Sequence, residues 1–262
     1  MNYEKYFRFG MDALDQTRSF ILQSIKDGFE KGKKPDKSFV TSADKGAERI
    51  LRSGIEDNFP GHGIVGEEYG ATNKTAEYVW YLDPIDGTAE FVNGLPQYGT
   101  LLSLHYKREP ILGLVDHPSL DLRLHAVKGN GSFINEERIT INGPDGKMPI
   151  ENEMIAIGPR FMFEKHGAGR VYDEIISAHK NISEVQNCHW YTRLLQGEFG
   201  AVIDYGLRMW DISHVKILVE EAGGSFYNVE EKIIDNKDRH AIISGKPHVV
   251  DWIMHLKSYK QI

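Results

Sequence analysis

The sequence predicts a fold of mixed helices and strands in two parts, an α+β part followed by an α/β part. Apolar residues first repeat at helical spacing, as in a long surface helix. From Tyr98 to Phe133, short apolar runs alternate with Gly, Pro and Asn turns, which is typical of an antiparallel meander. Beyond Lys147, strand patterns alternate with helical patterns, which favours an α/β arrangement.

The first part opens with a long helix. Its mostly apolar face is formed by Met11, Leu14, Arg18, Ile21, Ile25 and Phe29. The basic segment Lys31 to Lys37 follows, either as a solvated connection or as a mobile flap that draws an anionic substrate toward an acidic site. A short strand from Phe39 then gives way to a second helix with Asp44 in its first turn. The apolar face of this helix is formed by Ala47, Ile50, Leu51, Ile55 and Phe59.

The same patterns predict the later elements. The meander has strands at Thr100 to Tyr106, Ile111 to Val115, Leu122 to Val127 and Ser132 to Ile134. The Gly-Pro-Asp-Gly-Lys segment at 143–147 marks the boundary between an N-terminal α+β subdomain, 1–145, and a C-terminal α/β subdomain, 146–262. The second part has strands at Glu153 to Ile157, Ala201 to Tyr205, Ser225 to Tyr227 and Ala241 to Ser244. After residue 205 comes a helix whose apolar face is Ile212, Val215, Leu218, Val219 and Ala222.

The most informative stretch is the Asp-Pro-Ile-Asp-Gly-Thr segment at 83–88. The β-branched and aromatic residues before it predict a buried strand that stops at Asp83, because Pro84 cannot donate to a strand ladder. Asp86 can cap the turn after it, and Gly87 lets the backbone approach a ligand closely. A helical turn beginning near Thr88 would present free N–H groups to an anion.

Two carboxylates beside an anion site would repel the anion unless cations lay between them. Hard oxygen ligands favour Mg²⁺, which binds through one or two carboxylates, waters and substrate phosphate. The alternative is an ordinary polar turn, since Asp, Pro and Gly are common turn residues. An aspartyl-phosphatase signature fails because two residues separate Asp83 from Asp86. An EF-hand loop fails because Leu82, Pro84 and Phe91 stand where ligands are needed.

Three further acids stand at the ends of predicted elements. Glu67 follows a short strand at 63–66, and Asp44 and Asp211 lie at the starts of helices. Each alone is most simply a helix cap or a first-turn acid favoured by the helix dipole. Their joint occurrence with Asp83 and Asp86 favours a shared site.

Composition excludes several classes of function. The net charge of −7 argues against nonspecific nucleic-acid binding. The start lacks the apolar core of a signal peptide, and no apolar run approaches the ~20 residues of a membrane span. The single cysteine, Cys188, cannot form an internal disulfide, which fits a reducing cytoplasm. The GxGxxG match at 61–66 is not preceded by a strand, so it does not indicate a dinucleotide site.

The segments Val40 to Glu48, Gly66 to Glu68, Trp80 to Phe91 and Trp210 to Gly224 resemble the ordered motifs of the inositol monophosphatase family. This is a family of metal-dependent, lithium-sensitive phosphatases, and the resemblance covers nearly the whole chain. It implies a layered αβαβα sandwich of the inositol monophosphatase and fructose-1,6-bisphosphatase type. It also implies hydrolysis of a phosphomonoester by metal-activated water, and a homodimer.

The resemblance also implies roles for individual residues. Glu67, Asp83 and the carbonyl of Ile85 would hold a first Mg²⁺, and Asp83, Asp86 and Asp211 a second, with a weaker third ion leaning on Glu67. Thr88, with Asp44 behind it, would activate the attacking water. The amides of Gly87 and Thr88 would grip the phosphate oxygens.

Other residues of the chain are expected to determine which substrate is bound. Residues 185–189 depart from the stretch usual in inositol phosphatases, and 188–197 is similar to the histidinol-phosphatase branch, although Asn187 stands where that branch commonly has Asp. Asp204 can accept a hydrogen bond from a hydroxyl or an ammonium. His189, Trp190 and Tyr191 form either one buried helix face or a stacking surface for an imidazole. L-Histidinol phosphate is the expected substrate, and myo-inositol 1-phosphate or a related sugar phosphate is the alternative substrate. The alternative function is that of a non-catalytic regulatory protein that binds phosphate.

Overall fold

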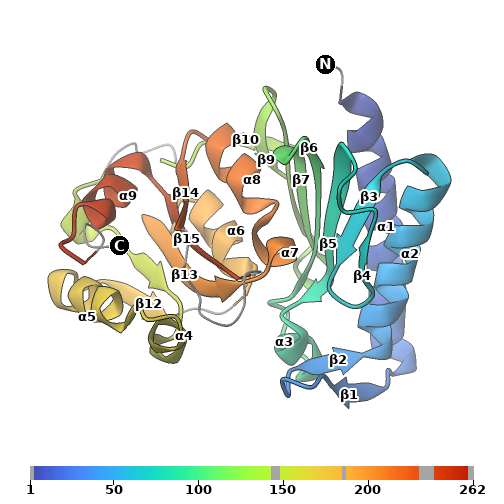
Figure 1. The fold of residues 1–262 in the computed structure, drawn as a ribbon, viewed down its shortest axis with the longest axis horizontal. Coiled ribbons are helices and arrows are strands. Elements are labelled where there is room, and N and C mark those ends of the chain that lie inside the picture. The colour runs from blue at the N-terminus through green and yellow to red at the C-terminus, as the bar shows by residue number, and fades with distance from the viewer. Residues whose placement is uncertain (1–2, 143–147, 185–186, 230–238, 259–262) are drawn as a thin grey trace.

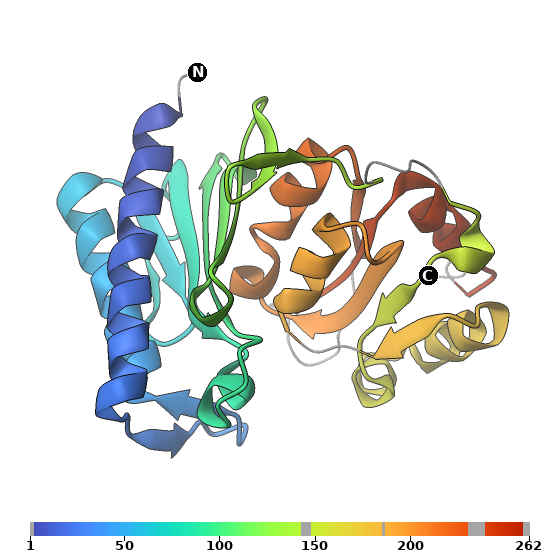
Figure 2. The same ribbon diagram turned by 180° about the vertical axis from the view of Figure 1, so that it is seen from behind.

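The protein is a layered sandwich of three helical layers and two sheets. The computed structural model describes residues 3–142, 148–184, 187–229 and 239–258. In Figure 1 the layers run in the order helix, sheet, helix, sheet, helix, and Figure 2 shows the same order from behind. This is the αβαβα arrangement that the family resemblance implies. The predicted boundary segment, 143–147, lies outside the described residues, so the division into two subdomains stays a prediction.

The N-terminal half contains an eight-stranded sheet in the order β10-β9-β8-β7-β6-β5-β3-β4. Its pairs are antiparallel apart from β3 and β5, which run parallel. The strands are β3 Gly63–Gly66, β4 Gly70–Thr72, β5 Tyr78–Asp86, β6 Gly99–Tyr106, β7 Glu109–His117, β8 Leu122–Val127, β9 Gly131–Ile134 and β10 Glu137–Ile139. The antiparallel meander from β6 to β9 confirms the prediction for that region. A separate hairpin of β1 Lys31–Lys33 and β2 Phe39–Thr41 carries the basic segment.

The C-terminal half contains a five-stranded mixed sheet in the order β12-β11-β13-β15-β14. The strand β11 lies parallel to β12 and β13, whereas β15 runs antiparallel to both of its neighbours. The strands are β11 Ile155–Ile157, β12 Ile182–Glu184, β13 Ala201–Leu207, β14 Ser225–Val229 and β15 His240–Gly245. The predicted strand at Glu153 to Ile157 is therefore shorter, and Glu153 instead lies buried against Lys246 as an ion pair of 2.8 Å.

Helices cover both sheets and fill the space between them (Figure 1). Their bounds are α1 Glu4–Asp27, α2 Ser42–Asn58, α3 Thr88–Val92, α4 Arg160–Lys165, α5 Gly169–Ala178, α6 His189–Leu195, α7 Met209–Ile212, α8 Val215–Glu221 and α9 Pro247–Met254, with short 3₁₀ turns at Pro118–Leu120 and Ile150–Asn152. α1 and α2 form one outer layer, α6 and α8 the central layer, and α4, α5 and α9 the other outer layer.

Strand periodicity explains this layering. In β6, Leu102 packs with α1 and α2, whereas its neighbour Leu101 packs into the central core shared with α6 and α8. Successive strand side chains point to opposite faces, so a strand that is apolar at both positions needs cover on both sides. Burial of these faces is the main stabilising contribution to the sandwich.

Two helix predictions need correction. The first helix ends at Asp27, because Gly28 has φ of 84° and breaks the helical path, so Phe29 lies beyond it and Ile25 is 44 % exposed. The helix predicted from Ile212 to Ala222 is broken between α7 and α8. At the break Ser213 is tied to the large sheet, since its Oγ bonds Ser103 at 2.7 Å and its carbonyl lies 3.1 Å from His105 Nε2.

Candidate active site

The strand β5 carries two carboxylates to the edge of the central layer. It does not stop at Asp83 as predicted, but continues to Asp86 with a register shift against β6 between these residues. Pro84 is tolerated inside the strand because the shift removes the need for its missing N–H, while its carbonyl accepts a bond from Thr100 Oγ1 at 2.8 Å. The irregular strand turns Asp83 and Asp86 toward the same site.

Gly87 makes the turn from β5 into α3. It has φ of 83°, and a Cβ at this position would lie 2.8 Å from the carbonyl oxygen of Gln97. Only glycine fits such a left-handed, crowded position without strain. Gly87 is also the N-cap of α3, so the expectation that Asp86 caps this turn is wrong. Asp86 Oδ2 accepts a hydrogen bond from the Cys188 backbone N–H at 2.5 Å instead.

Asp83, Asp86 and Asp211 form an acidic triad in which one oxygen of each carboxylate lies within 4.8 Å of the others. Asp83 is 2 % exposed, and the other two are half-buried. Burial, with the charges of its acidic neighbours, raises the pKa of Asp83 well above its usual range, and burial raises the pKa of Asp86 to about 6. Like charges held this closely are costly without a cation, so the donor set fits a divalent metal ion.

Asp211 reaches the triad from the other half of the chain. It lies in the first turn of α7, where its Oδ2 accepts the Arg208 N–H at 2.7 Å. The expected position at a helix start is therefore confirmed, although that helix is only the short α7. Burial raises the pKa of Asp211 well above its usual range, and the negative charge of Asp86 raises it further. The two halves of the sandwich thus meet at the triad.

Glu67 lies beside Asp83 at the end of β3, and its charge contributes to the raised pKa of Asp83. Its Oε1 is 2.6 Å from the ammonium of Lys34, which also contacts Glu68 at 2.6 Å. Burial opposes the charge on Lys34, yet Glu67 and Glu68 raise its pKa above the usual range. The ammonium of Lys34 therefore neutralises negative charge at Glu67 and Glu68, as a metal ion at this position would.

The turn that carries Glu67 is held in place by hydrogen bonds to the fully buried Glu48 of α2. Glu48 accepts the backbone N–H groups of Glu68 and Tyr69 at 2.7 and 3.1 Å and pairs with Arg52 at 2.7 Å. Sequence reasoning gave no role to Glu48 or to Lys34. The basic segment was the one available signal for Lys34, whereas a buried Glu inside a helix pattern gives none.

Thr88 lies at the first position of α3 within reach of Asp44. Thr88 Oγ1 is 3.3 Å from Asp44 Oδ1 and 3.0 Å from the carbonyl oxygen of Ile85, either of which can accept its proton. Asp44 is fully buried and accepts the N–H of Thr41 at 2.8 Å in a capping box. Burial raises the pKa of Asp44, although the Thr41 hydrogen bonds oppose it. The predicted pairing of Thr88 with Asp44 is thus compatible with the geometry.

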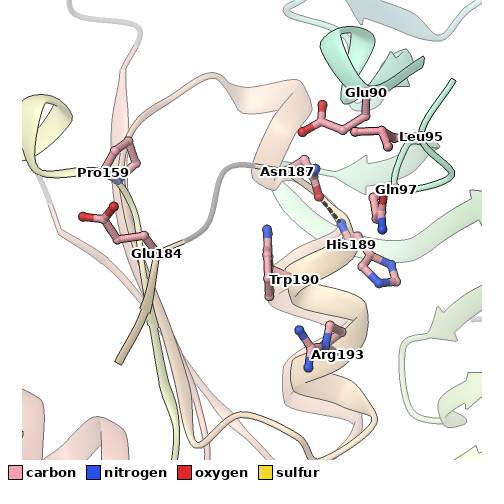
Figure 3. A pocket seen from close by; sticks show the side chains of 9 residues that line it. All are labelled: Glu90, Leu95, Gln97, Pro159, Glu184, Asn187, His189, Trp190 and Arg193. Atoms are coloured by element: carbon pink, nitrogen blue, oxygen red, sulfur yellow. Dashed lines mark hydrogen bonds between the residues drawn. The ribbon is translucent and has the colours of Figure 1, made fainter. Parts of the chain in front are cut away.

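A cavity of about 590 Å³ is lined by residues of both halves of the chain, none of them in the triad. Its lining is linked to the triad through Cys188, which lies between the lining residues Asn187 and His189 and donates its N–H to Asp86 Oδ2. Figure 3 shows its lining: Glu90, Leu95, Gln97, Pro159, Glu184, Asn187, His189, Trp190 and Arg193. Glu90 is close enough to Asp86 for its charge to raise the pKa of that carboxyl. His189 and Trp190 of α6 face the cavity while Tyr191 is buried, so this triplet is split between the two expected roles.

The two predicted substrate residues have different surroundings. Asn187 lines the cavity, and its Oδ1 accepts the His189 N–H at 3.1 Å (Figure 3). Asp204 lies in β13, 9 % exposed, and is not among the described residues that line the cavity. Burial raises its pKa to about 7, although it accepts the Tyr205 N–H at 2.8 Å.

A layered sandwich with a carboxylate triad next to a glycine turn that opens a helix suits metal-assisted hydrolysis of phosphate esters. Residues 4–259 match the model of the inositol monophosphatase family. The chain therefore belongs to the inositol monophosphatase family, and it is a phosphatase that hydrolyses phosphomonoesters.

Individual relatives agree with this class. The chain is 34 % identical over 226 residues to the bifunctional phosphatase IMPL2 of Arabidopsis thaliana, covering 85 % of this chain and 64 % of that protein. It is 28 % identical over 218 residues to a histidinol-phosphatase of Chlorobaculum parvum, covering 81 % and 78 %. The solved structure of the SuhB protein of Bartonella henselae has the same fold, with a TM-score of 0.83 at 20 % identity and coverage of 98 % and 99 %.

In the part of the chain that the structure describes, no helix combines the length and the apolar character needed to cross a membrane.

Proposed function

We propose that the protein is a Mg²⁺-dependent phosphatase of L-histidinol phosphate. The observation that carries this proposal is the cavity lining, which contains two carboxylates, Glu90 and Glu184, and the aromatic rings of His189 and Trp190. The leaving alcohol of histidinol phosphate carries an ammonium group and an imidazole. Carboxylates suit the ammonium, and aromatic rings suit the flat imidazole.

The positive charge in the cavity lining does not cancel this preference. The guanidinium of Arg193 pairs with Glu198 at 2.5 Å and lies over the rings of Trp190 and Phe199 at 5.1 and 4.8 Å. Glu184 accepts a bond from Tyr172 at 2.6 Å, which leaves its other oxygen open to a ligand. Asn187 spends its Oδ1 on the His189 N–H, so its amide group can donate to a substrate but brings no charge.

The proposed metal ligands are Glu67, Asp83, Asp86, Asp211 and the carbonyl of Ile85. When bound, Mg²⁺ would lower the pKa of a water and balance the charge of the phosphate. We propose two to three ions. The third would lean on Glu67 and would compete there with the ammonium of Lys34, which lies 2.6 Å from Glu67 Oε1.

The residues of this chain supply positioning and proton transfer. Thr88 Oγ1 can accept a hydrogen bond from the attacking water while it donates to Asp44 Oδ1. Asp44 is buried with a raised pKa, which makes it a better proton acceptor than an exposed carboxylate. The amides of Gly87 and Thr88, at the open end of α3, would hold the phosphate oxygens. Asp204 is the proposed contact of the leaving group; it lies against Gly158, the neighbour of the cavity-lining Pro159.

A phosphate-release panel tests the substrate. Purified protein with Mg²⁺ is offered L-histidinol phosphate, myo-inositol 1-phosphate, fructose 1,6-bisphosphate and a 3′-phosphoadenosine nucleotide. The highest kcat/KM should belong to histidinol phosphate. Preference for inositol 1-phosphate would establish the alternative substrate, and release from none of the esters would refute the phosphatase proposal.

The matched variant is Glu90→Gln, which removes one cavity charge at nearly constant shape. It should raise KM for histidinol phosphate about tenfold, since a charged hydrogen bond contributes roughly 1.5–3 kcal/mol, and leave KM for inositol 1-phosphate unchanged. Equal effects on both esters would show that Glu90 does not recognise the ammonium. Glu137→Gln on the exposed part of β10 serves as the control for loss of charge alone.

Three further properties belong to the proposal. We infer a homodimer in the cytoplasm and inhibition by lithium, in line with the family resemblance. A regulatory protein that binds phosphate esters without turnover is the remaining alternative. The contact between Thr88 and Asp44 favours turnover, because a binder has no use for a water-activating pair. Calorimetry that shows tight ester binding without phosphate release would favour the binder.

A further inference from the structure

The wall of the leaving-group cavity depends on the placement of one short helix. α6 presents His189, Trp190 and Arg193 to the cavity, and it buries Tyr191 and Leu194 in the central core. A helix of two turns has little stability of its own, so its orientation must come from tertiary contacts.

Two polar bonds attach α6 to the N-terminal half of the chain. At its start, the Cys188 N–H donates to Asp86 Oδ2 at 2.5 Å. One turn later, Thr192 Oγ1 lies 2.8 Å from Nε2 of His117, at the end of β7. The first bond uses a backbone N–H at the helix start and the second a side chain one turn later, so α6 is held at two separate points.

The bond between His117 and Thr192 has a defined direction. His117 Nδ1 lies 2.8 Å from the carbonyl oxygen of Tyr98, and a carbonyl can only accept, so Nδ1 carries the proton. Nε2 of the neutral ring is then an acceptor, and the Thr192 hydroxyl donates to it. Burial lowers the pKa of His117 to about 4, which agrees with a neutral ring at physiological pH.

The strand end that carries His117 is itself held firmly. The preceding residue, Asp116, is fully buried and accepts hydrogen bonds from Arg18 at 2.7 Å and from Arg123 at 2.7 Å. Both nitrogens of His117 are occupied, one toward the loop after α3 and one toward α6. The imidazole therefore bridges two segments, and both of these segments contribute residues to the cavity lining.

We propose that His117 and Thr192 are positioning residues that set leaving-group specificity by fixing the angle of α6 against the cavity. The inference rests on the proposed function, because it takes this cavity as the leaving-group site. Without the Thr192 hydroxyl, α6 stays attached at Cys188 but can pivot about its first turn. Such a pivot moves the wall formed by Trp190 and Arg193, while the acidic triad and the Gly87 turn stay in place.

The test compares Thr192→Val, which keeps the shape and loses the hydroxyl, with Thr192→Ser, which keeps the hydroxyl. T192V should raise KM for L-histidinol phosphate at least ~fivefold, because α6 loses the hydrogen bond that holds the cavity wall in place, with kcat changed less than about twofold. The competitive inhibition constant of inorganic phosphate should not change, and T192S should restore the KM. These two constants do not depend on the fraction of folded enzyme, so partial misfolding cannot imitate the result.

His117→Ala gives an independent check. Since both residues act through one bond, H117A with T192V should raise KM no more than H117A alone. Additive effects would overturn the proposal, as would a T192V enzyme with normal KM or with KM and the phosphate constant shifted equally. If the wild type does not hydrolyse histidinol phosphate, the proposed substrate fails, and the same comparison is made with the ester of the panel that it does hydrolyse.

Discussion

Replacing Asp86 by Asn isolates the charge of one carboxylate of the triad. The amide oxygen of Asn can still accept the Cys188 N–H, which is 2.5 Å from Asp86 Oδ2, so the attachment of α6 is kept. The variant loses one negative charge in a cluster whose oxygens lie within 4.8 Å of one another. A cation bound among these oxygens loses the attraction of that charge, which for two unit charges of opposite sign about 4 Å apart at an effective dielectric constant of about 20 is ~4 kcal/mol.

That energy corresponds to roughly a thousandfold in rate or metal affinity, since each 1.36 kcal/mol is about tenfold. Allowing for partial compensation by the remaining carboxylates, we expect D86N to lose at least about a hundredfold in kcat/KM at subsaturating Mg²⁺. Phosphate release gives the rate, and circular dichroism shows that the variant is folded. The exposed Asp57→Asn on α2 controls for charge removal. Turnover near the wild-type value would remove Asp86 from the metal site and refute the reasoning.

Four further predictions test the remaining parts of the site. Thr88→Ala should lower kcat by ~10²–10³ while Thr88→Ser stays within about tenfold, because only the hydroxyl can pass a proton; equal losses in steady-state assays would contradict this. Gly87→Ala should destabilise the fold by about 2 kcal/mol in urea denaturation, given its φ of 83° and the contact at 2.8 Å; an unchanged midpoint would show that the turn can relax. Lys34→Met should tighten Mg²⁺ binding about fivefold in calorimetry, because the ion no longer competes with an ion pair of about 1 kcal/mol, with Lys33→Met as the control; weaker binding would make Lys34 a helper of the metal. Asp86 has a folded pKa of about 6, above its unfolded value of about 3.9. Its contribution to the stability of the fold is therefore complete below about pH 4 and is lost as pH rises through 6. Without metal, Tm should fall from pH 5 to 7.5 and Mg²⁺ should raise it more at pH 7.5; a rising metal-free Tm would contradict this.

The prediction of elements succeeded where local pattern and tertiary environment agree. The meander strands from β6 to β9 follow their apolar runs, and Asp44 lies in the first turn of α2 as expected. Errors arose where a tertiary contact outweighs a local rule. Pro84 reads as the end of a strand, but β5 continues through it because β6 accepts the register shift.

The same reason explains which site residues could not be predicted from the sequence. Glu48 and Lys34 act through contacts with the turn after β3, some 20 to 33 residues away along the chain. His117 and Thr192 are 75 residues apart, and nothing in the segments around them indicates that they pair. A pattern within a short window cannot report a pairing of this kind, since only the packed sandwich brings the two residues together.

By itself the sequence determined the chemistry of the site: five acids, a hydroxyl and a glycine turn at the ends of strands and helices, spaced as in one phosphatase family. Those features are local in the sequence, because residue types and their spacing can be read within short segments, although the path of β5 through Pro84 depends on its pairing with β6. The tertiary structure decided which residues line the cavity that we propose for the leaving group. The cavity wall combines α3, β12 and α6, and the orientation of α6 is set by bonds to Asp86 and His117 in the other half of the chain. Only the packing of the two sheets around the central helices creates that surface.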